Sequence, residues 1–373
     1  MTALWRCTQL CEVRISATGF PSPSGIDELM KILLVAPIDE TVPPVAYGGI
    51  EQVVHLLDHD LTARGHNVTL LASSGSVAAS RLIPITDEPI ERPHNDREAE
   101  YVTAIKHQAV QRVATVLADE RPDIVLNHSW RVLDTLTSYS SLTTVHFPLD
   151  TEPYRSIFLT KKHAAYISIS NAQKRDALNL LFVATIYNGI DVAAMPYSGQ
   201  QGDYLAFLGR VSPEKGLDIA IRTAQRIGIP LRIAAKLDHV HVPWFHDVIL
   251  PLAQRGGVEF VGEITASQKG PFLSRAIALL HPSRCNEPFG LAVVEAMACG
   301  TPVVALNRGA AIEIIQHGYT GFVVDNEAGI WTAIKNLHKI ERSACREHAA
   351  SRFDRHRMAE EYEKFALAHL AKQ

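Results

Sequence analysis

Short apolar runs alternate with longer amphipathic stretches along most of this chain, and this alternation restricts its fold more than any other feature. The apolar runs, such as residues 31–36, are strand-sized and rich in Val, Ile and Leu, whereas stretches such as residues 50–64 carry apolar side chains at helical spacing. Buried parallel strands connected by helices produce this pattern. The sequence therefore predicts an α/β fold built on parallel sheets.

The alternation occurs in two series, separated near residues 188–202 by a segment that contains Gly, Pro, Ser and Gln. Such a composition is typical of a connector, and 373 residues suit two domains. In the first series we expect strands at residues 31–36, 67–72, 124–127, 143–146, 166–168 and 183–187, with helices at 50–64 and 98–120. In the second we expect strands at residues 204–208, 231–235, 258–261, 278–281, 303–305 and 321–324, with helices at 216–227, 291–299 and 330–340.

These series place the domains at residues 30–198 and 199–352, followed by a charged amphipathic helix within residues 353–373. Residues 1–29 show no clear periodicity, so we expect them to form a loosely attached, poorly ordered extension. Charged residues interrupt what would be the apolar part of a signal peptide there. No apolar run approaches the roughly 20 residues that cross a bilayer. We therefore expect a cytoplasmic protein without stable membrane insertion.

The charge balance argues against a nucleic-acid partner. The chain has 36 Lys and Arg against 40 Asp and Glu, a net charge of −4, which leaves no basic excess to neutralise a phosphate backbone. Its 5 cysteines are too few and too scattered for a disulfide framework in a chain of this length. These observations argue against a nucleic-acid partner and against a disulfide-stabilised fold.

Arg210 and Lys215 follow the expected strand at residues 204–208, just before Gly216 and a helix. Ligands of open parallel sheets bind at the carboxyl ends of the strands. A planar guanidinium and a mobile ammonium at that position together suit a diphosphate. The structural alternative is a pair of solvated charges beside a turn.

A second candidate is the segment that contains Glu287, Pro288, Gly290 and Glu295. Pro288 and Gly290 bend the chain before the helix expected at residues 291–299, whose amino end exposes unpaired N–H groups suited to phosphate. The structural alternative makes Glu287 a carboxylate at a helix amino end and Glu295 the partner of a nearby base.

The first domain offers weaker signals. Gly48 and Gly49 precede a helix and would allow the backbone to approach a phosphate, although an ordinary loop-to-helix glycine pair is the commoner case. His146 ends an expected strand, where a histidine is more often structural.

No cofactor or metal is expected. The Asp58-His59-Asp60 triplet lies within a predicted helix, where side chains two residues apart point in different directions. The histidine-rich segment at residues 239–247 is interpreted as a surface loop rather than a metal site.

Taken in order, Gly48-Gly49, His146, Gly209-Arg210, Lys215-Gly216 and Glu287-x7-Glu295 within EPFGLAVVEAMACGTPVVA resemble family 4 glycosyltransferases of the GT-B fold. The resemblance covers about residues 30–365. It implies two Rossmann-like domains that face an interdomain cleft, with a nucleotide-sugar donor on the second and a small-molecule or glycan acceptor on the first. It further implies transfer with retention of anomeric configuration, and a final helix that packs back toward the first domain.

The resemblance also implies roles for the candidate residues. Arg210 and Lys215 would neutralise the donor diphosphate, and Glu287 would accept hydrogen bonds from sugar hydroxyls. The remaining donor contacts would come from the backbone of Phe289, Gly290 and Leu291, from Glu295 at the ribose, from Gly48 and Gly49 at the phosphates, and from His146 near the reacting carbon. Stabilising the departing diphosphate is the main chemical task, and cations and helix amino ends can do it without metal.

The alternatives to a glycosyltransferase are a non-catalytic nucleotide-sugar sensor and a nucleotide-sugar epimerase. The Glu-x7-Glu segment disfavours the epimerase. Nicotinamide chemistry is disfavoured because no G-x-G-x-x-G follows a strand.

Overall fold

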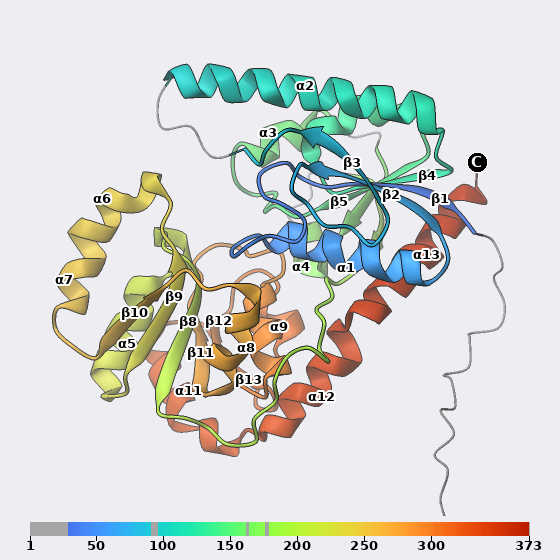
Figure 1. Cartoon of the computed structure of the whole chain (residues 1–373). Helices are drawn as coiled ribbons and strands as arrows, with labels where there is room; N and C mark the ends of the chain where they lie inside the picture. Colours follow the sequence, from blue (N-terminus) through green and yellow to red (C-terminus); the bar gives the residue numbers. More distant parts are fainter. Residues whose placement is uncertain (1–28, 91–95, 162–163, 176–178, 373) are drawn as a thin grey trace, which may run out of the picture.

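The computed structural model describes residues 29–90, 96–161, 164–175 and 179–372 (Figure 1). Nearly all of the extension expected at residues 1–29 lies outside the described residues. Within the described residues the strands form two parallel sheets, each of which belongs to its own α/β lobe. The expected α/β architecture with parallel sheets is therefore confirmed.

The first sheet has the strand order β3-β2-β1-β4-β5-β6-β7. Its strands are β1 (Lys31–Val35), β2 (Asn67–Ser73), β3 (Arg81–Thr86), β4 (Ile124–Asn127), β5 (Ser141–Val145), β6 (Tyr166–Ser168) and β7 (Phe182–Thr185). The sequence pattern did not predict β3, which contains Pro84 and is largely accessible. A proline strand of this kind is tolerated because β3 lies at the edge of the sheet.

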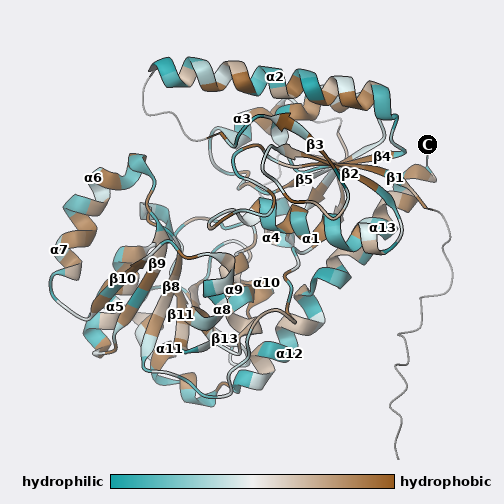
Figure 2. Cartoon of the chain, viewed as in Figure 1, coloured by the Kyte–Doolittle hydropathy of each residue, from teal (hydrophilic) through white to brown (hydrophobic). Residues whose placement is uncertain are grey.

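Side chains of β1 alternate between two apolar layers of this sheet. Ile32 and Leu34 belong to the layer that also contains α1 (Gly49–Ala63), whereas Leu33 and Val35 belong to the layer that contains α2 (Asp96–Glu120). The strands are apolar while the outer faces of the helices are mixed (Figure 2). Further helical segments of this domain are a 3-10 helix (Trp130–Leu136), α3 (Tyr154–Leu159) and α4 (Asn171–Arg175).

The second sheet has the order β10-β9-β8-β11-β12-β13. Its strands are β8 (Tyr204–Arg210), β9 (Leu231–Lys236), β10 (Val258–Gly262), β11 (Ala276–His281), β12 (Val303–Leu306) and β13 (Gly321–Val324). Its α-helices are α5 (Leu217–Ile227), α6 (Val242–Trp244), α7 (Leu250–Ala253), α8 (Ala266–Ser274), α9 (Leu291–Ala298), α10 (Ala311–Ile314), α11 (Glu327–Lys335) and α12 (Arg342–Phe353).

Some expected boundaries in this domain were wrong. The segment at residues 239–247, interpreted as a surface loop, forms consecutive helical turns that end in α7. The helix expected at residues 330–340 ends at Lys335 and is followed by a 3-10 turn, Leu337–Lys339. The helix expected from residue 353 is confirmed as α13 (Arg355–Leu370), which begins after Asp354, whose side chain accepts the His356 N–H group, but the preceding helix α12, which ends at Phe353, was not predicted.

Helix α13 leaves the second domain and packs against α1 of the first (Figure 1). Its buried residues Met358, Ala359, Tyr362 and Ala366 complete the apolar layer on that face of the first sheet. The crossing is fixed by Arg355, which pairs with Asp60 of α1 and lies 3.2 Å from Asp191 Oδ2. The two domains are therefore joined by the connector near residue 190 and by this helix.

Both sheets reverse their strand order at one point, between β1 and β4 in the first and between β8 and β11 in the second. Ligands of doubly wound sheets bind outside the carboxyl ends of the strands at such a switch point. The residues that follow β4 and β5, and those that end β8 and β11, are therefore the places to look for function.

Candidate active site

The second domain places a charged cluster at its switch point. Glu287 lies between two bases: Lys215 Nζ donates to Glu287 Oε1 over 2.5 Å, and His281 Nε2, at the end of β11, lies 3.2 Å from Glu287 Oε2. Burial would raise the pKa of Glu287, but the charges of Lys215 and His281 outweigh it and hold that pKa well below its ordinary range. Glu287 is therefore a fixed anion, and Lys215 its fixed cation.

Arg210, at the end of β8, has a different environment. Its nearest carboxylates, Glu214 and Asp238, lie 3.9 and 3.8 Å from its Nη atoms, beyond ordinary hydrogen-bond distance. Its Nε is buried and has no hydrogen-bond partner in the described part of the chain. Burial disfavours the charge of Arg210, yet Tyr47 and the surrounding carboxylates raise its pKa overall. The guanidinium is charged and its donors are poorly satisfied.

The start of α9 lies beside this cluster. Gly290 has φ +104°, a value that favours glycine, and begins the helix with its carbonyl accepting from Val293 N–H. A Cβ atom on Gly290 would lie 3.7 Å from His281 Nε2, so the turn and the Glu287 cluster are neighbours. Phe289 is buried and packs near Tyr187 and Phe353, which anchors the loop.

The glycine pair of the first domain faces this turn across the junction between the domains. A Cβ atom on Gly49 would lie 3.0 Å from Leu291 Cδ1 of the second domain, and one on Gly48 would lie 2.5 Å from Pro44 Cβ. The pair thus permits two close approaches, one within its own loop and one to the start of α9.

The same junction holds contacts that the sequence did not indicate. The Tyr47 N–H group donates to Glu263 Oε1 over 3.1 Å, and the Tyr47 ring lies 5.9 Å from Arg210 Cζ and from Lys236 Nζ. Lys236 is the β9 partner of Arg210 in the sheet and its Nζ lies 3.0 Å from Glu40 Oε1 of the first domain. The contacts between the two domains join residues more than 160 positions apart, so no local motif marks them.

His146 follows β5, on the other side of the junction. Four residues later Asp150 Oδ2 accepts a 2.9 Å hydrogen bond from Asn286 Nδ2, next to Glu287. His146 Nε2 lies 2.8 Å from Nδ1 of His128, which follows β4 at the switch point of the first sheet. Burial lowers the pKa of His146 to about 3. Burial also holds the pKa of His128 well below its ordinary range, and the neighbouring His146 lowers it further. Both imidazoles are therefore neutral.

Glu295 does not join the Glu287 cluster. It is buried on α9 and its Oε1 accepts a 2.9 Å hydrogen bond from Lys269 Nζ of α8. This is the structural alternative that the sequence left open, a carboxylate paired with a nearby base. The sequence did not indicate Lys269, because nothing in the chain around it resembles a binding motif.

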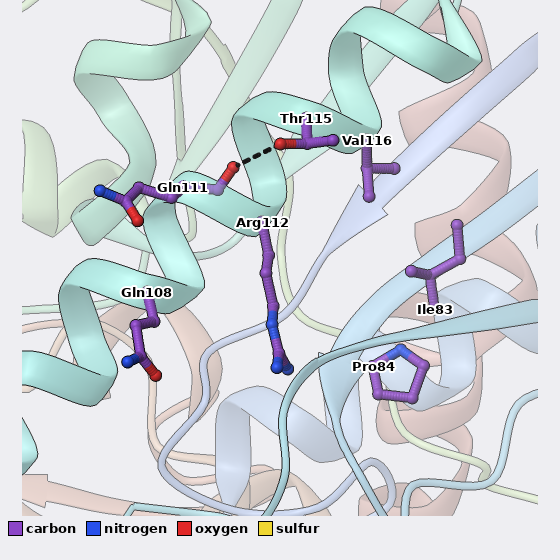
Figure 3. Close-up of a pocket in the computed structure, with 7 residues that line it drawn as sticks. All are labelled: Ile83, Pro84, Gln108, Gln111, Arg112, Thr115 and Val116. Carbon is purple, nitrogen blue, oxygen red and sulfur yellow. Dashed lines mark hydrogen bonds between the residues drawn. The ribbon is translucent and has the colours of Figure 1, made fainter.

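A separate hollow lies between α2 and β3 in the first domain (Figure 3). It is lined by Ile83, Pro84, Gln108, Gln111, Arg112, Thr115 and Val116. It shares none of the candidate residues, and Arg112 Nη1 lies 3.3 Å from Asp87 Oδ1. We therefore place the functional site at the junction rather than here.

The Asp58-His59-Asp60 triplet has structural partners. Asp58 accepts from Ala79 N–H and Ser80, and Asp60 accepts from Arg355. Among the described residues no group of three or more His, Cys, Asp and Glu side chains is arranged to hold a metal ion.

Over the same residues no helix has the length and apolar character needed to cross a bilayer.

Two α/β domains that meet at the carboxyl ends of their parallel strands, with a helix returning from the second to the first, define the GT-B class of glycosyltransferases. Each half of the chain matches a family model of its own. Residues 198–352 match the model of the glycosyl transferases group 1, and residues 47–194 match that of glycosyltransferase family 4. The chain belongs to this family and is a glycosyltransferase, as the sequence motifs suggested.

Among curated proteins, the chain is similar to a glycogen synthase of Mycobacterium tuberculosis. The two are 27% identical over an alignment 383 residues long, which covers 87% of this chain and 89% of the relative. Among solved structures, it resembles AviGT4, a glycosyltransferase involved in avilamycin A biosynthesis, with TM-score 0.72, 24% identity and coverage of 92% and 99%. It also resembles Anabaena HepE in complex with UDP-glucose, with TM-score 0.69, 19% identity and coverage of 91% and 100%. These structural likenesses concern the fold.

Proposed function

We propose that the protein is a metal-independent, retaining glycosyltransferase that moves a sugar from a nucleoside-diphosphate sugar to a small-molecule or glycan acceptor. The observation that carries the proposal is the state of Arg210: a partly buried, charged guanidinium at the switch point, with a buried, unpartnered Nε and no carboxylate within ordinary hydrogen-bond distance in the described part of the chain. An anion bound there would complete its hydrogen bonds. A diphosphate is the anion that the site suits best.

Three groups would act on the diphosphate. Arg210 offers a planar fork, Lys215 a point charge, and the amino end of α9 at Gly290 unpaired N–H groups with partial positive charge. Breaking the bond between the sugar and the diphosphate places additional negative charge on the leaving group. Donors already oriented toward that charge lower the barrier without reorganising during the reaction.

Glu287 is better suited to bind sugar hydroxyls than to attack the sugar. Its carboxylate is held between Lys215 and His281, which stabilise it as an acceptor of hydrogen bonds and make it a weak nucleophile. We therefore favour front-face transfer over double displacement through an enzyme-bound sugar. The acceptor oxygen forms its bond to the anomeric carbon on the face from which the diphosphate departs. The departing phosphate oxygen takes the acceptor proton.

Metal independence is supported by the cations themselves. Arg210 and Lys215 supply the positive charge that a divalent ion would otherwise bring to the diphosphate. Asp58 and Asp60, the two carboxylates of the Asp-His-Asp triplet, are engaged with Ser80 and Arg355. We expect no resident cofactor.

The proposed function is tested with a panel of UDP-, GDP-, ADP- and dTDP-sugars and mixed acceptors, with EDTA present. The expected result is release of a nucleoside diphosphate and, for the active pair, an NMR coupling constant that shows a product with the anomeric configuration of the donor. Release only after metal is added back would contradict metal independence, and an inverted product would contradict retention. Binding of a donor without turnover in any combination would favour the sensor.

A further inference from the structure

His128 is a buried residue that no motif marked and that touches a candidate catalytic group. It is 1% exposed, follows β4 at the switch point of the first sheet, and its Nδ1 lies 2.8 Å from His146 Nε2. The two rings are stacked with centroids 5.1 Å apart and an interplanar angle of 27°. Because each neutral imidazole carries one N–H group, only one of these two nitrogens is protonated, and it donates to the other.

The remaining nitrogens of the two rings decide which partner donates. His128 Nε2 is buried and has no hydrogen-bond partner among the described residues, whereas His146 Nδ1 is not among the buried unpartnered atoms. If His146 Nε2 donated, the proton of His128 would sit on Nε2 as a buried N–H group without an acceptor. Such orphaned donors are rare because they lose the full hydration of the group. The favourable arrangement has His128 Nδ1–H donating to His146 Nε2.

This arrangement determines the chemistry of His146. With Nε2 accepting, the proton of the His146 ring is on Nδ1, the nitrogen that remains available to a ligand. The ring would then donate a hydrogen bond to an oxygen of the bound donor. It would not accept a proton from the acceptor hydroxyl at that nitrogen.

Two residues, Gln173 and Tyr362, bond to or pack against the segments that carry the pair. Gln173 Nε2 donates to the carbonyl groups of Val145 and Phe147, on both sides of His146, over 2.9 and 3.0 Å. Tyr362 of the returning helix α13 lies with its ring 5.8 Å from that of His128. Its hydroxyl bonds with Thr144 Oγ1 over 2.7 Å.

We propose that His128 is a positioning residue that holds His146 in the Nδ1-protonated tautomer, so that His146 donates a hydrogen bond to a sugar or phosphate oxygen of the donor. The catalytic part of this inference rests on the proposed glycosyl transfer. The tautomer itself is a property of the unliganded protein.

The tautomer is tested first by NMR on protein with ¹⁵N-labelled histidine, in which Nδ1–H and Nε2–H forms of imidazole differ in their nitrogen shifts. His146→Gln identifies the signals of His146. The expected result is an Nδ1-protonated, neutral His146 in the wild-type protein and a loss of that fixed form in His128→Leu. An Nε2-protonated or charged His146 in the wild type overturns the proposal, whatever the activity.

The catalytic role is tested with two variants of matched size. His128→Asn places an amide N–H where Nδ1–H was, and His128→Leu removes the donor while it keeps a branched side chain. We expect His128→Leu to lower kcat about tenfold with little change in nucleoside diphosphate affinity, because that affinity resides in the second domain. His128→Asn is expected to recover most of the loss. Equal losses in both variants, or a loss confined to affinity, would overturn the role.

His66→Gln is the control for burying a changed histidine in the same domain. His66 is buried, bonds with Glu363 of α13 over 3.0 Å, and lies outside the candidate site. It should lower the melting temperature while leaving kcat unchanged. A fall in kcat equal to that of His128→Leu would show that His128 acts only through stability. If the panel detects no transfer by the wild type, the proposed function fails while the NMR result still decides the tautomer.

Discussion

The two switch points of this molecule have opposite electrostatic character. At the end of β8 and β11, the second domain gathers Arg210, Lys215 and Glu287, all of which are charged. At the end of β4 and β5, the first domain presents His128 and His146, both of which burial keeps neutral. The same sheet topology therefore supports two kinds of site: one suited to binding an anion, the other to an uncharged hydrogen-bonding contact.

The difference fits a division of labour in glycosyl transfer. Departure of a diphosphate needs positive charge on one side of the reacting carbon, whereas a positive group beside the developing positive sugar would oppose the reaction. In the proposed mechanism, neutral imidazoles on the first domain would avoid that repulsion. Changing the charges at each switch point in turn tests this difference.

Replacement of Lys215 should have the largest effect. Lys215→Met leaves the largely buried Glu287 without its cation at 2.5 Å, while His281 remains 3.2 Å away, so the stability cost should approach the roughly 3–5 kcal/mol of a broken buried ion pair. Turnover should fall by at least about 10³-fold, since the leaving group loses a cation and Glu287 loses its position. The measurements are urea unfolding and nucleoside diphosphate release. The double variant Lys215→Met/Glu287→Gln should regain stability without regaining turnover, and recovery of turnover would contradict a role for the lysine in the reaction.

Arg210→Ala should lower turnover by about 10²-fold, as expected for loss of one preorganised donor to developing charge. Its effect on stability should be smaller than that of Lys215→Met, because its carboxylate neighbours lie 3.8 and 3.9 Å away. Arg232→Ala is a suitable control, since Arg232 pairs with Glu259 on the accessible edge of the same sheet. Equal activity of the two alanine variants would count against the electrostatic role of the switch point.

Glu51 of α1 extends the comparison to the pH dependence of folding stability in the first domain. Burial, and to a lesser extent Asp39 and Glu40, raise the pKa of this carboxyl on α1 to about 7 from 4.5. The folded state then binds a proton that the unfolded state has lost, so this contribution is present below pH 4.5 and disappears as pH rises through 7. We expect Glu51→Gln to remove roughly 2–4 kcal/mol of that pH dependence in unfolding experiments between pH 4.5 and 7.5. Identical pH profiles for both proteins would show that Glu51 is ionised in the fold.

Gly49→Ala should have the smallest effect. The added Cβ would meet Leu291 Cδ1 at 3.0 Å, and that atom is the end of a flexible side chain that can move. A rise in donor KM of about twofold to fivefold is expected if the glycine pair approaches the phosphates. Gly309→Ala provides the contrast, because its Cβ would lie 2.2 Å from the Glu287 carbonyl oxygen and cannot be accommodated without displacing that backbone. A larger loss in Gly49→Ala than in Gly309→Ala would contradict this account.

Much of the fold followed from local pattern. Strands such as β1, β4 and β8 are continuous apolar runs, and the positions of Arg210 and His146 after such runs placed them at strand ends. Strand β3 escaped prediction because Pro84 and its accessible neighbours do not form an apolar run. Helix α12 escaped because its mean character is polar and its buried face is narrow.

The site was harder to predict where it depends on the assembly of the two domains. Glu287 and Lys215 belong to recognisable segments, but their 2.5 Å pairing joins positions 72 residues apart. His128 lies in Asn-His-Ser with no distinguishing motif, and only the parallel pairing of β4 with β5 brings it to His146. The pairing of Glu295 with Lys269 of α8 likewise required the packing of two helices.

The most direct test of the central claim is the shift in melting temperature that a nucleoside diphosphate produces with EDTA present. A ligand that binds only the folded protein stabilises it by RT ln(1 + [L]/Kd). The account predicts a clear increase with at least one of UDP, GDP, ADP and dTDP for the wild type and for Arg232→Ala, and a much smaller increase for Arg210→Ala. An equal shift in all three proteins, or no shift with any of the four, would contradict the claim that the cations of the second domain hold the diphosphate.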